Sequence, residues 1–341
     1  LFMNPTLYTG TGSTLNITGV GFQPDLVWLK KRSAAGNHYL FDVVRGAQKN
    51  IHSNENFAEV TEATTLTAFG SDGFTLSTDG GVNQNGATFA SWNWKANGAG
   101  SANTDGSISS TVSVNTTSGF SIVKYVGTGS GSNSTVGHGL GVTPSIIIVK
   151  SLDSVADWVV WNKDLPSQTN NYLRLNTNQA IGTTTNYWNS SAPTNQVFGV
   201  SPDGYNNNKS GEDTVAYCFN DVQGFSKSGS YTGNGNDSGP FVYTGFKPSF
   251  VMIKRTDGTA SWLMFDNKRA NPFNEITADL RADLNNAEDA SASYNNIDFL
   301  SNGFKIRKSN ADINGSGATY IYMAFASAPL VGTNNIPANA R

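Results

Sequence analysis

The chain contains the same ten-residue phrase three times. Each copy starts with glycine, has proline at its fourth position, runs on as a short apolar stretch and ends at lysine. The copies are GFQPDLVWLK at 21–30, GVTPSIIIVK at 141–150 and GFKPSFVMIK at 245–254. Repetition at this spacing indicates that one supersecondary unit has been copied, so all three copies should share one fold. We expect a chain built from copied modules to hold or bind rather than to catalyse.

Other motifs recur around this phrase in a constant order. They are a Tyr-x-Gly-x-Gly motif, an aromatic–aliphatic run, a turn ending in Gly and an aromatic residue, and a closing apolar strand. The first motif stands at 8–12, 125–129 and 231–235, the second at 39–42, 158–162 and 262–266, the third at 72–74, 203–205 and 302–304, and the fourth at 87–94, 214–219 and 319–325. Length alone suggests about two domains. The repeat instead predicts three modules, at 1–98, 99–222 and 223–332, followed by a C-terminal tail at 333–341.

The apolar runs are typical of β-strands. They are short, rich in β-branched and aromatic residues, and bounded by Gly, Pro, Asn and Ser. The runs at 146–149 and 250–253 do not alternate, so both faces of those strands should be buried. Residues 275–288 show helical spacing, but the matching stretch at 171–177 alternates and is poor in helix formers. We therefore predict no helix there, and an all-β fold of three tandem β-sandwich-like modules.

The composition argues against several classes of partner. Charged residues make up 14% of the chain, against about 25% in a typical soluble domain. The formal net charge of −3 gives no reason to expect binding to nucleic acid or to an anionic membrane. No apolar run approaches the roughly 18 residues that a membrane helix needs. A surface rich in hydroxyl and amide groups suits β proteins that meet sugars or pack into assemblies.

Metal, cofactor and disulfide chemistry are not predicted. Cys218 is the single cysteine, so the chain cannot form an internal disulfide, and we expect a buried free thiol. His38, His52 and His138 are far apart and do not occupy matching positions in the repeat, whereas zinc needs three or four converging ligands. We expect His138, in a glycine-rich turn, to be solvated.

The sequence offers no convincing catalytic residues. Glycoside hydrolysis needs two carboxylates that flank one sugar bond. Asp153 with Asp157, or Glu212 with Asp213, could supply such a pair, but neither pair recurs in the other copies. The chain also lacks the G-x-S-x-G motif of a serine nucleophile. We expect a protein without enzymatic activity.

One acid does recur in two of the copies. Asp42 and Asp266 occupy equivalent positions, and each is followed three residues later by an arginine, Arg45 or Arg269. The second copy has Asn162 at this place. An ion pair at the end of a strand explains this pattern better than catalysis does.

Aromatic residues in a polar loop give the best candidate contact surface. Asn186, Tyr187, Trp188 and Asn189 lie within the hydroxyl- and amide-rich stretch 183–191. Large rings in such surroundings lose solvation free energy unless they pack or bind, and sugar faces stack on aromatic rings. Two hypotheses remain: either the rings cap the edge of the sandwich as core, or they contact a ligand or partner. We predict the contact surface, because divergent loops on a shared scaffold tend to carry recognition.

The chain resembles a family of bacteriophage virion proteins that are common in marine and other tailed phages. The resemblance rests on long motifs that span nearly the whole chain. They lie at 8–33, 40–46, 136–151, 210–219, 229–255, 297–307, 320–326 and 338–341. It implies a structural protein on the surface of the phage particle. Members of the family often carry a segment before the first module, so an attachment segment could precede Leu1 in the natural protein. The family has no assigned catalytic residues that could be transferred.

The resemblance leaves the position in the particle open. The leading hypothesis is a tail-fibre or adhesin component whose modules are rigid spacers and whose loop tips touch a host surface glycan. The alternative is a capsid decoration or head-fibre protein that binds other capsid subunits. A polysaccharide-cleaving enzyme and a non-viral extracellular binding module are weaker hypotheses. We expect other virion proteins as partners and a homo-oligomer, most plausibly a trimer, because apolar module faces could be buried against other copies.

Overall fold

The computed structural model describes residues 1–129, 134–200, 206–269, 274–291 and 293–327. The protein is all-β, as the sequence predicts, and its strands form antiparallel sheets. The expected C-terminal tail at 333–341 and the middle copy of the Gly–aromatic turn at 203–205 lie outside the described residues.

The same run of four neighbouring strands occurs three times, as the whole main sheet in module 1 and as part of an eight-stranded and a five-stranded sheet in modules 2 and 3. In module 1 it runs β1 (Met3–Thr9), β9 (Thr88–Trp94), β3 (Leu26–Lys31), β4 (His38–Asp42). In module 2 it runs β12 (Phe120–Val126), β19 (Asp213–Phe219), β14 (Ile146–Ser151), β15 (Val159–Asn162). In module 3 it runs β20 (Ser226–Thr232), β27 (Thr319–Phe325), β22 (Phe250–Arg255), β23 (Leu263–Asp266). The lysine-ended phrase forms the third strand each time, so the prediction that the three copies share one strand position is confirmed.

A smaller sheet covers the outer side of each module. These sheets are β2 (Leu15–Ile17), β8 (Gly73–Leu76), β7 (Leu66–Gly70) in module 1; β13 (Thr135–Gly137), β18 (Val197–Gly199) in module 2; and β21 (Phe241–Tyr243), β26 (Gly303–Ile306), β25 (Ile297–Leu300) in module 3. The remaining elements are β5 (Lys49–Asn50), β6 (Val60–Thr61), β10 (Ser101–Asn103), β11 (Ser110–Asn115), β16 (Asn171–Arg174), β17 (Gly182–Thr183), β24 (Leu280–Arg281), α1 (Gly80–Asn83) and α2 (Ala311–Asn314). Two stacked sheets per module give the predicted sandwich-like architecture.

The stretch with helical spacing at 275–288 contains no helix. It holds β24, which pairs with β23 as β16 pairs with β15 in module 2. Comparing the copies therefore gave the correct structure where periodicity alone would have misled.

The repeated Tyr-x-Gly-x-Gly motif has a structural cause. A Cβ atom on the first glycine of the motif, Gly10, Gly127 or Gly233, would lie 2.2 to 2.3 Å from a backbone carbonyl oxygen. The close approach leaves room only for glycine. The motif is thus part of the scaffold and not a phosphate or ligand loop.

The apolar strands are buried on both faces because each main sheet has apolar side chains packed against both sides, in two separate cores in modules 1 and 2 and in one continuous core in module 3. On β14, Ile146 and Ile148 point into a core shared by the three modules, whereas Ile147 and Val149 point into the core of module 2 itself. On β3, Trp28 belongs to the shared core. This alternation explains the absence of a polar face in these strands.

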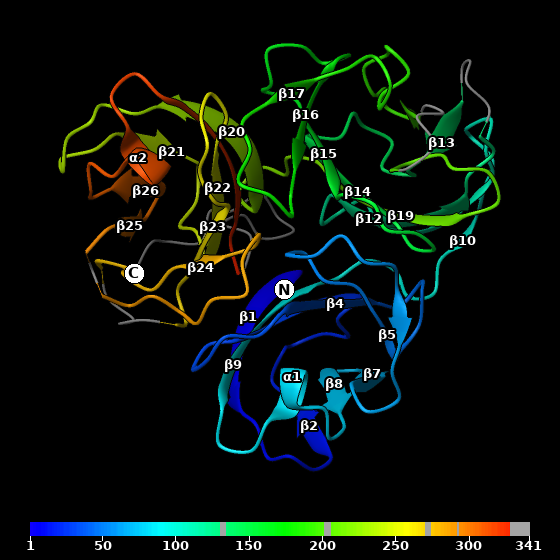
Figure 1. Ribbon diagram of the computed structural model, residues 1–341, viewed down its shortest axis with the longest axis horizontal. Coiled ribbons are helices and arrows are strands. Elements are labelled where there is room, and N and C mark those ends of the chain that lie inside the picture. Colours follow the sequence, from blue (N-terminus) through cyan, green and yellow to red (C-terminus); the bar gives the residue numbers. More distant parts are fainter. Residues whose placement is uncertain (130–133, 201–205, 270–273, 292, 328–341) are drawn as a thin grey trace, which may run out of the picture.

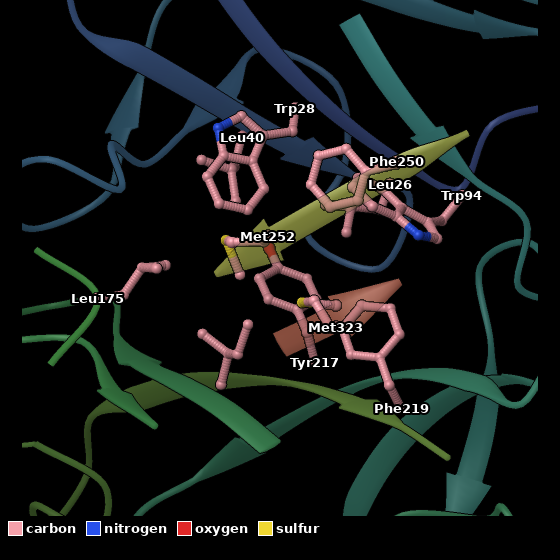
Figure 2. Close-up of a pocket in the computed structure, with 11 residues that line it drawn as sticks. Leu26, Trp28, Leu40, Trp94, Leu175, Tyr217, Phe219, Phe250, Met252 and Met323 are labelled. Atoms are coloured by element: carbon pink, nitrogen blue, oxygen red, sulfur yellow. The ribbon is translucent and has the colours of Figure 1, made fainter. Parts of the chain in front are cut away.

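The three modules surround the shared core as three lobes (Figure 1). Aromatic and aliphatic side chains from all three main sheets converge there (Figure 2). Trp94 makes edge contacts with Phe219 and Phe250, and Phe219 makes one with Phe325. The free space between them is about 10 Å³, which is at the lower limit for one water molecule. The centre is therefore a packed core and offers no room for a ligand.

The modules do not form a row but close into a single body around a common core. Six tryptophans on or next to the main-sheet strands are buried. Trp161 belongs to the core of module 2. The other five help to build the shared core, and they are Trp28, Trp92, Trp94, Trp158 and Trp262.

Candidate functional site

The loop predicted as a contact surface does not present its aromatic rings. The Trp188 side chain is fully buried, and its Nε1 donates to the carbonyl of Asn171 over 3.0 Å. The Tyr187 ring is buried against Tyr172, with ring centroids 4.6 Å apart. The hypothesis of an exposed aromatic pair is therefore wrong for both rings, and the alternative of a core cap is correct.

The polar neighbours of these rings explain why the prediction failed. Asn186 is exposed and Asn189 is half-buried, so the loop does lie at the surface. Its rings turn inward because the outer sheet of module 2 has only two strands, β13 and β18, in the described residues. Both rings join the core of that module and cover an area that a longer sheet would otherwise close. The polar sequence correctly indicated that the loop backbone lies at the surface. It did not indicate that the two aromatic side chains point inward.

The lysines that end the repeated phrase lie at the contacts between modules. Lys30, Lys150 and Lys254 are fully buried. Each ammonium donates to the carbonyl of the next residue in its own module, at 2.7, 2.6 and 2.8 Å. Each also reaches a carbonyl of a neighbouring module at 3.3 to 3.5 Å. Desolvation by burial lowers the pKa of all three groups to about 8.

The carbonyls on the other side belong to three equivalent asparagines. Asn56 of module 1, Asn178 of module 2 and Asn285 of module 3 face Lys150, Lys254 and Lys30, respectively. The same carbonyls accept backbone N–H groups of the lysine-bearing module at 2.8 to 2.9 Å. We call each such junction a seam. Module 2 docks on module 1, module 3 on module 2 and module 1 on module 3, so the seams close a ring.

A second contact repeats along each seam. Trp158 Nε1 donates to the carbonyl of His52 over 2.9 Å, and Trp262 Nε1 donates to the carbonyl of Arg174 over 2.8 Å. In module 1 the equivalent residue is His38, whose Nε2 lies 2.9 Å from the carbonyl of Arg281. The pKa of His38 is lowered well below its usual value, first by burial and then by the nearby Lys30 charge. A neutral ring that donates through Nε2 therefore serves here as the tryptophans do elsewhere.

Two of the three seams contain a buried charged triad. In module 1, Arg45 pairs with Asp42 and, over 2.9 Å, with Glu59, and the Asp42 carboxylate accepts the hydroxyl of Tyr217 from module 2 over 2.7 Å. Module 3 repeats the pattern. Its members are Arg269, Asp266 and Glu288, with Trp92 of module 1 donating to Asp266 over 2.9 Å. The strand-end ion pairs predicted from the sequence are confirmed, and the structure adds a donor from the next module.

The third seam holds neutral residues at these positions. Asn162, Leu165 and Ile181 stand where the other modules have Asp, Arg and Glu. The facing residue of module 3 is Met323, which cannot donate a hydrogen bond. Leu165 joins the shared core, and Ile181 packs against it. Asn162 instead donates through its side-chain amide to the hydroxyl of Ser228 in module 3 over 3.1 Å.

The carboxylates considered for catalysis bind other parts of the protein. Asp157 pairs with Arg174 over 2.9 Å, and Asp213 pairs with Lys124 over 2.6 Å. Asp153 accepts the backbone N–H of Asp213 over 2.7 Å, and Glu212 accepts the hydroxyl of Ser154 over the same distance. They hold loops together.

Two of the three histidines, His38 and His138, and the thiol are buried. His138 is fully buried and close to the carbonyl of Thr194, which corrects the expectation of a solvated side chain. Cys218 is buried and free, as expected. Within the described part of the chain, no three His, Cys, Asp or Glu side chains gather where they could hold a metal ion.

The structure exposes a different aromatic pair, which sequence reasoning missed. Phe241 and Tyr243 on β21 are 44% and 59% exposed. They lie at alternate positions of one strand, so both rings are on its outer face. Module 1 has Asn16 and Thr18 at these positions. The sequence did contain a signal for this pair, because the two aromatic residues stand at positions where the other copies have small or polar residues.

Comparison with known proteins identifies a family. The model of a family described as a domain of unknown function (DUF7483) matches residues 1–329. The chain belongs to this family. No curated protein matches it.

The DUF7483 match covers all three modules. The family unit therefore corresponds to the closed body with its three seams and not to one module. None of the described helices is long and apolar enough to cross a membrane.

Proposed function

We propose that this protein is a non-enzymatic structural component of a bacteriophage particle, most plausibly part of a tail fibre or adhesin that contacts the host surface. The observation that carries the proposal is the repeated, closed body in which buried polar groups link modules to one another. These buried polar groups connect one module to the next. The long motifs that resemble those of phage virion proteins support placing the protein in a phage particle.

The absence of catalysis is also a proposal, and it has a direct test. The carboxylates of Asp157 and Glu212 bind Arg174 and Ser154 within the fold. Incubation with host lipopolysaccharide and capsule should therefore release no oligosaccharides. Release of defined fragments, abolished by Asp157→Asn or Glu212→Gln in a variant that still folds, would overturn this part of the proposal.

A capsid decoration or head-fibre protein is the second candidate. The modules close around a common core instead of forming a row of spacers, and a compact body with three related lobes suits docking on a particle surface. Cryo-electron microscopy of the particle separates the two candidates. Density for this body on tail fibres supports the first, density on the head supports the second, and its absence from purified particles rejects both.

Partners are part of the same proposal. We propose other virion proteins as partners and a host surface glycan as ligand. The trimer was expected because apolar module faces need to be buried, but these faces are already buried against one another within one chain. Light scattering on the purified protein measures its oligomeric state. A stable trimer would have to form through a surface other than these module faces.

A further inference from the structure

The outer face of β21 combines two exposed rings with a fixed geometry. Phe241 and Tyr243 are separated by one buried residue, Val242, so their rings are spaced by about 7 Å along the strand. In module 2 the equivalent positions carry Thr135 and Gly137. Module 3 alone of the three copies presents this pair.

Glycines hold both rings against the backbone. A Cβ atom on Gly303 would lie 3.0 Å from ring carbons of Phe241, and one on Gly245 would lie 3.6 to 3.9 Å from the Tyr243 phenol. Each ring therefore rests on a residue without a side chain, and each remains partly exposed, 44% for Phe241 and 59% for Tyr243. Aromatic side chains have few rotatable bonds, so ordering them on binding costs little conformational entropy.

Two lysines lie close to these rings. Lys227 Nζ lies 5.3 Å from the Tyr243 ring centroid. Lys305 is the cross-strand partner of Phe241, and its Nζ donates to the carbonyl of Gly239 over 2.9 Å. The next strand carries Asp298, which is already 3.5 Å from Arg307. The rings are thus flanked by the ammonium groups of Lys227 and Lys305, and Asp298 on the next strand has a partner in Arg307.

We propose that Phe241, Tyr243, Lys227 and Lys305 form a binding site for an anionic polysaccharide. The apolar faces of consecutive sugar rings stack on the two aromatic rings, and carboxylate or sulfate groups of the glycan pair with the lysines. The ligand class rests on the proposed function as a host-contacting protein, and the site itself rests on the geometry above.

Binding to defined glycans tests the site. Affinity electrophoresis of the full chain is run in gels that contain sodium hyaluronate, sodium polygalacturonate or neutral hydroxyethyl cellulose. We expect retardation by at least one acidic glycan and little by the neutral one. The double variant F241N/Y243T installs the residues of module 1 on the same scaffold, so it should keep the fold. It should weaken binding to the acidic glycan about tenfold or more, as loss of central aromatic contacts does.

Two further variants sharpen the result. Lys305→Gln should weaken acidic-glycan binding severalfold. Phe57→Gln should leave binding unchanged, because this 58% exposed ring lies in module 1 and module 2 has Gln179 at the equivalent position. No retardation by either acidic glycan, or equal retardation of wild type and F241N/Y243T, overturns the site. If F241N/Y243T instead unfolds while binding per folded molecule is unchanged, the rings only cover the glycines, and the proposal again fails.

The two proposals can fail separately. Adsorption of the wild-type protein to host cells that survives F241N/Y243T would reject this site and leave the host-contact function standing. If the protein binds glycan through this site but is absent from purified particles, the site is supported and the proposed function in the particle is rejected.

Discussion

The seam between modules 1 and 2 and the seam between modules 2 and 3 solve one packing problem in different ways. In the first, the buried pair Asp42 and Arg45 contacts the half-buried Glu59, and Asp42 receives a hydrogen bond from Tyr217. In the second, an amide and two aliphatic side chains occupy the same places beside Met323. The backbone and lysine contacts are alike in both. The fold therefore does not require charge at this point, but a charged set must be complete, because a buried charge without a partner is strongly destabilising.

The largest effect should come from breaking a triad at its centre. Arg45→Leu leaves the Asp42 carboxylate buried without its cation, so we expect a loss of about 3–5 kcal/mol in the free energy of unfolding. Urea denaturation measures it. Arg269→Leu is the matched variant in module 3 and should behave alike. A loss below about 1 kcal/mol in both would show that the triads contribute little.

A smaller loss should follow removal of the donor from the next module. Tyr217→Phe deletes the hydroxyl that donates to Asp42 and keeps the ring in the shared core. Hydrogen bonds to charged groups contribute about 1.5–3 kcal/mol, and we expect a loss in that range. Tyr231→Phe is the control, because its hydroxyl donates to a neutral carbonyl of Ile313 and should cost about 1 kcal/mol. Equal losses in the two variants would contradict the special role of the acid.

Each of the three seams contains a buried lysine, and we expect these lysines to make the free energy of unfolding depend on pH. Their pKa is about 8 in the folded protein and near 10.4 when unfolded. Between these values the unfolded chain binds more protons, so stability should rise with pH, by at most about 1 kcal/mol per pH unit for each lysine. Lys150→Met should reduce the slope of stability between pH 8 and 9.5 relative to wild type. Identical slopes would mean that Lys150 titrates normally when folded.

The smallest effect is expected when a whole triad is exchanged. The variant D42N/R45L/E59I gives module 1 the residues of module 2, removing every charge together. We expect stability within about 1 kcal/mol of wild type, because replacing a complete buried ionic set by packed apolar groups is often neutral. A loss as large as that of Arg45→Leu would show that the two seams are not interchangeable, and that Tyr217 cannot tolerate a weaker acceptor.

The repeat made the modules and their strands predictable, but not their arrangement. Copies of one phrase indicate equal folds, and they led correctly to the equivalent strands that end at Lys30, Lys150 and Lys254. They do not say which surfaces meet, because the facing carbonyls of Asn56, Asn178 and Asn285 lie outside every recognised motif. The closed ring was therefore missed.

Individual sites show the same limit. The Asp42–Arg45 and Asp266–Arg269 pairs are local in sequence, and spacing alone predicted them. Trp188 was misjudged because burial depends on a distant part of module 2, which local polarity does not report. The Phe241–Tyr243 face could have been found by asking where an outer strand of one copy departs from the others.

The closing seam also has a consequence for synthesis. Lys30 and Asn285 are 255 residues apart in the chain, so a ribosome must release most of module 3 before module 1 can complete its contacts. Until then Trp28 and Trp92 have no partner from module 3 to cover them. Long-range closure of this kind slows folding and exposes apolar surface on the way. A nascent chain therefore exposes apolar surface until most of module 3 has been synthesised. We expect the folded body to gain protease resistance late and in one step.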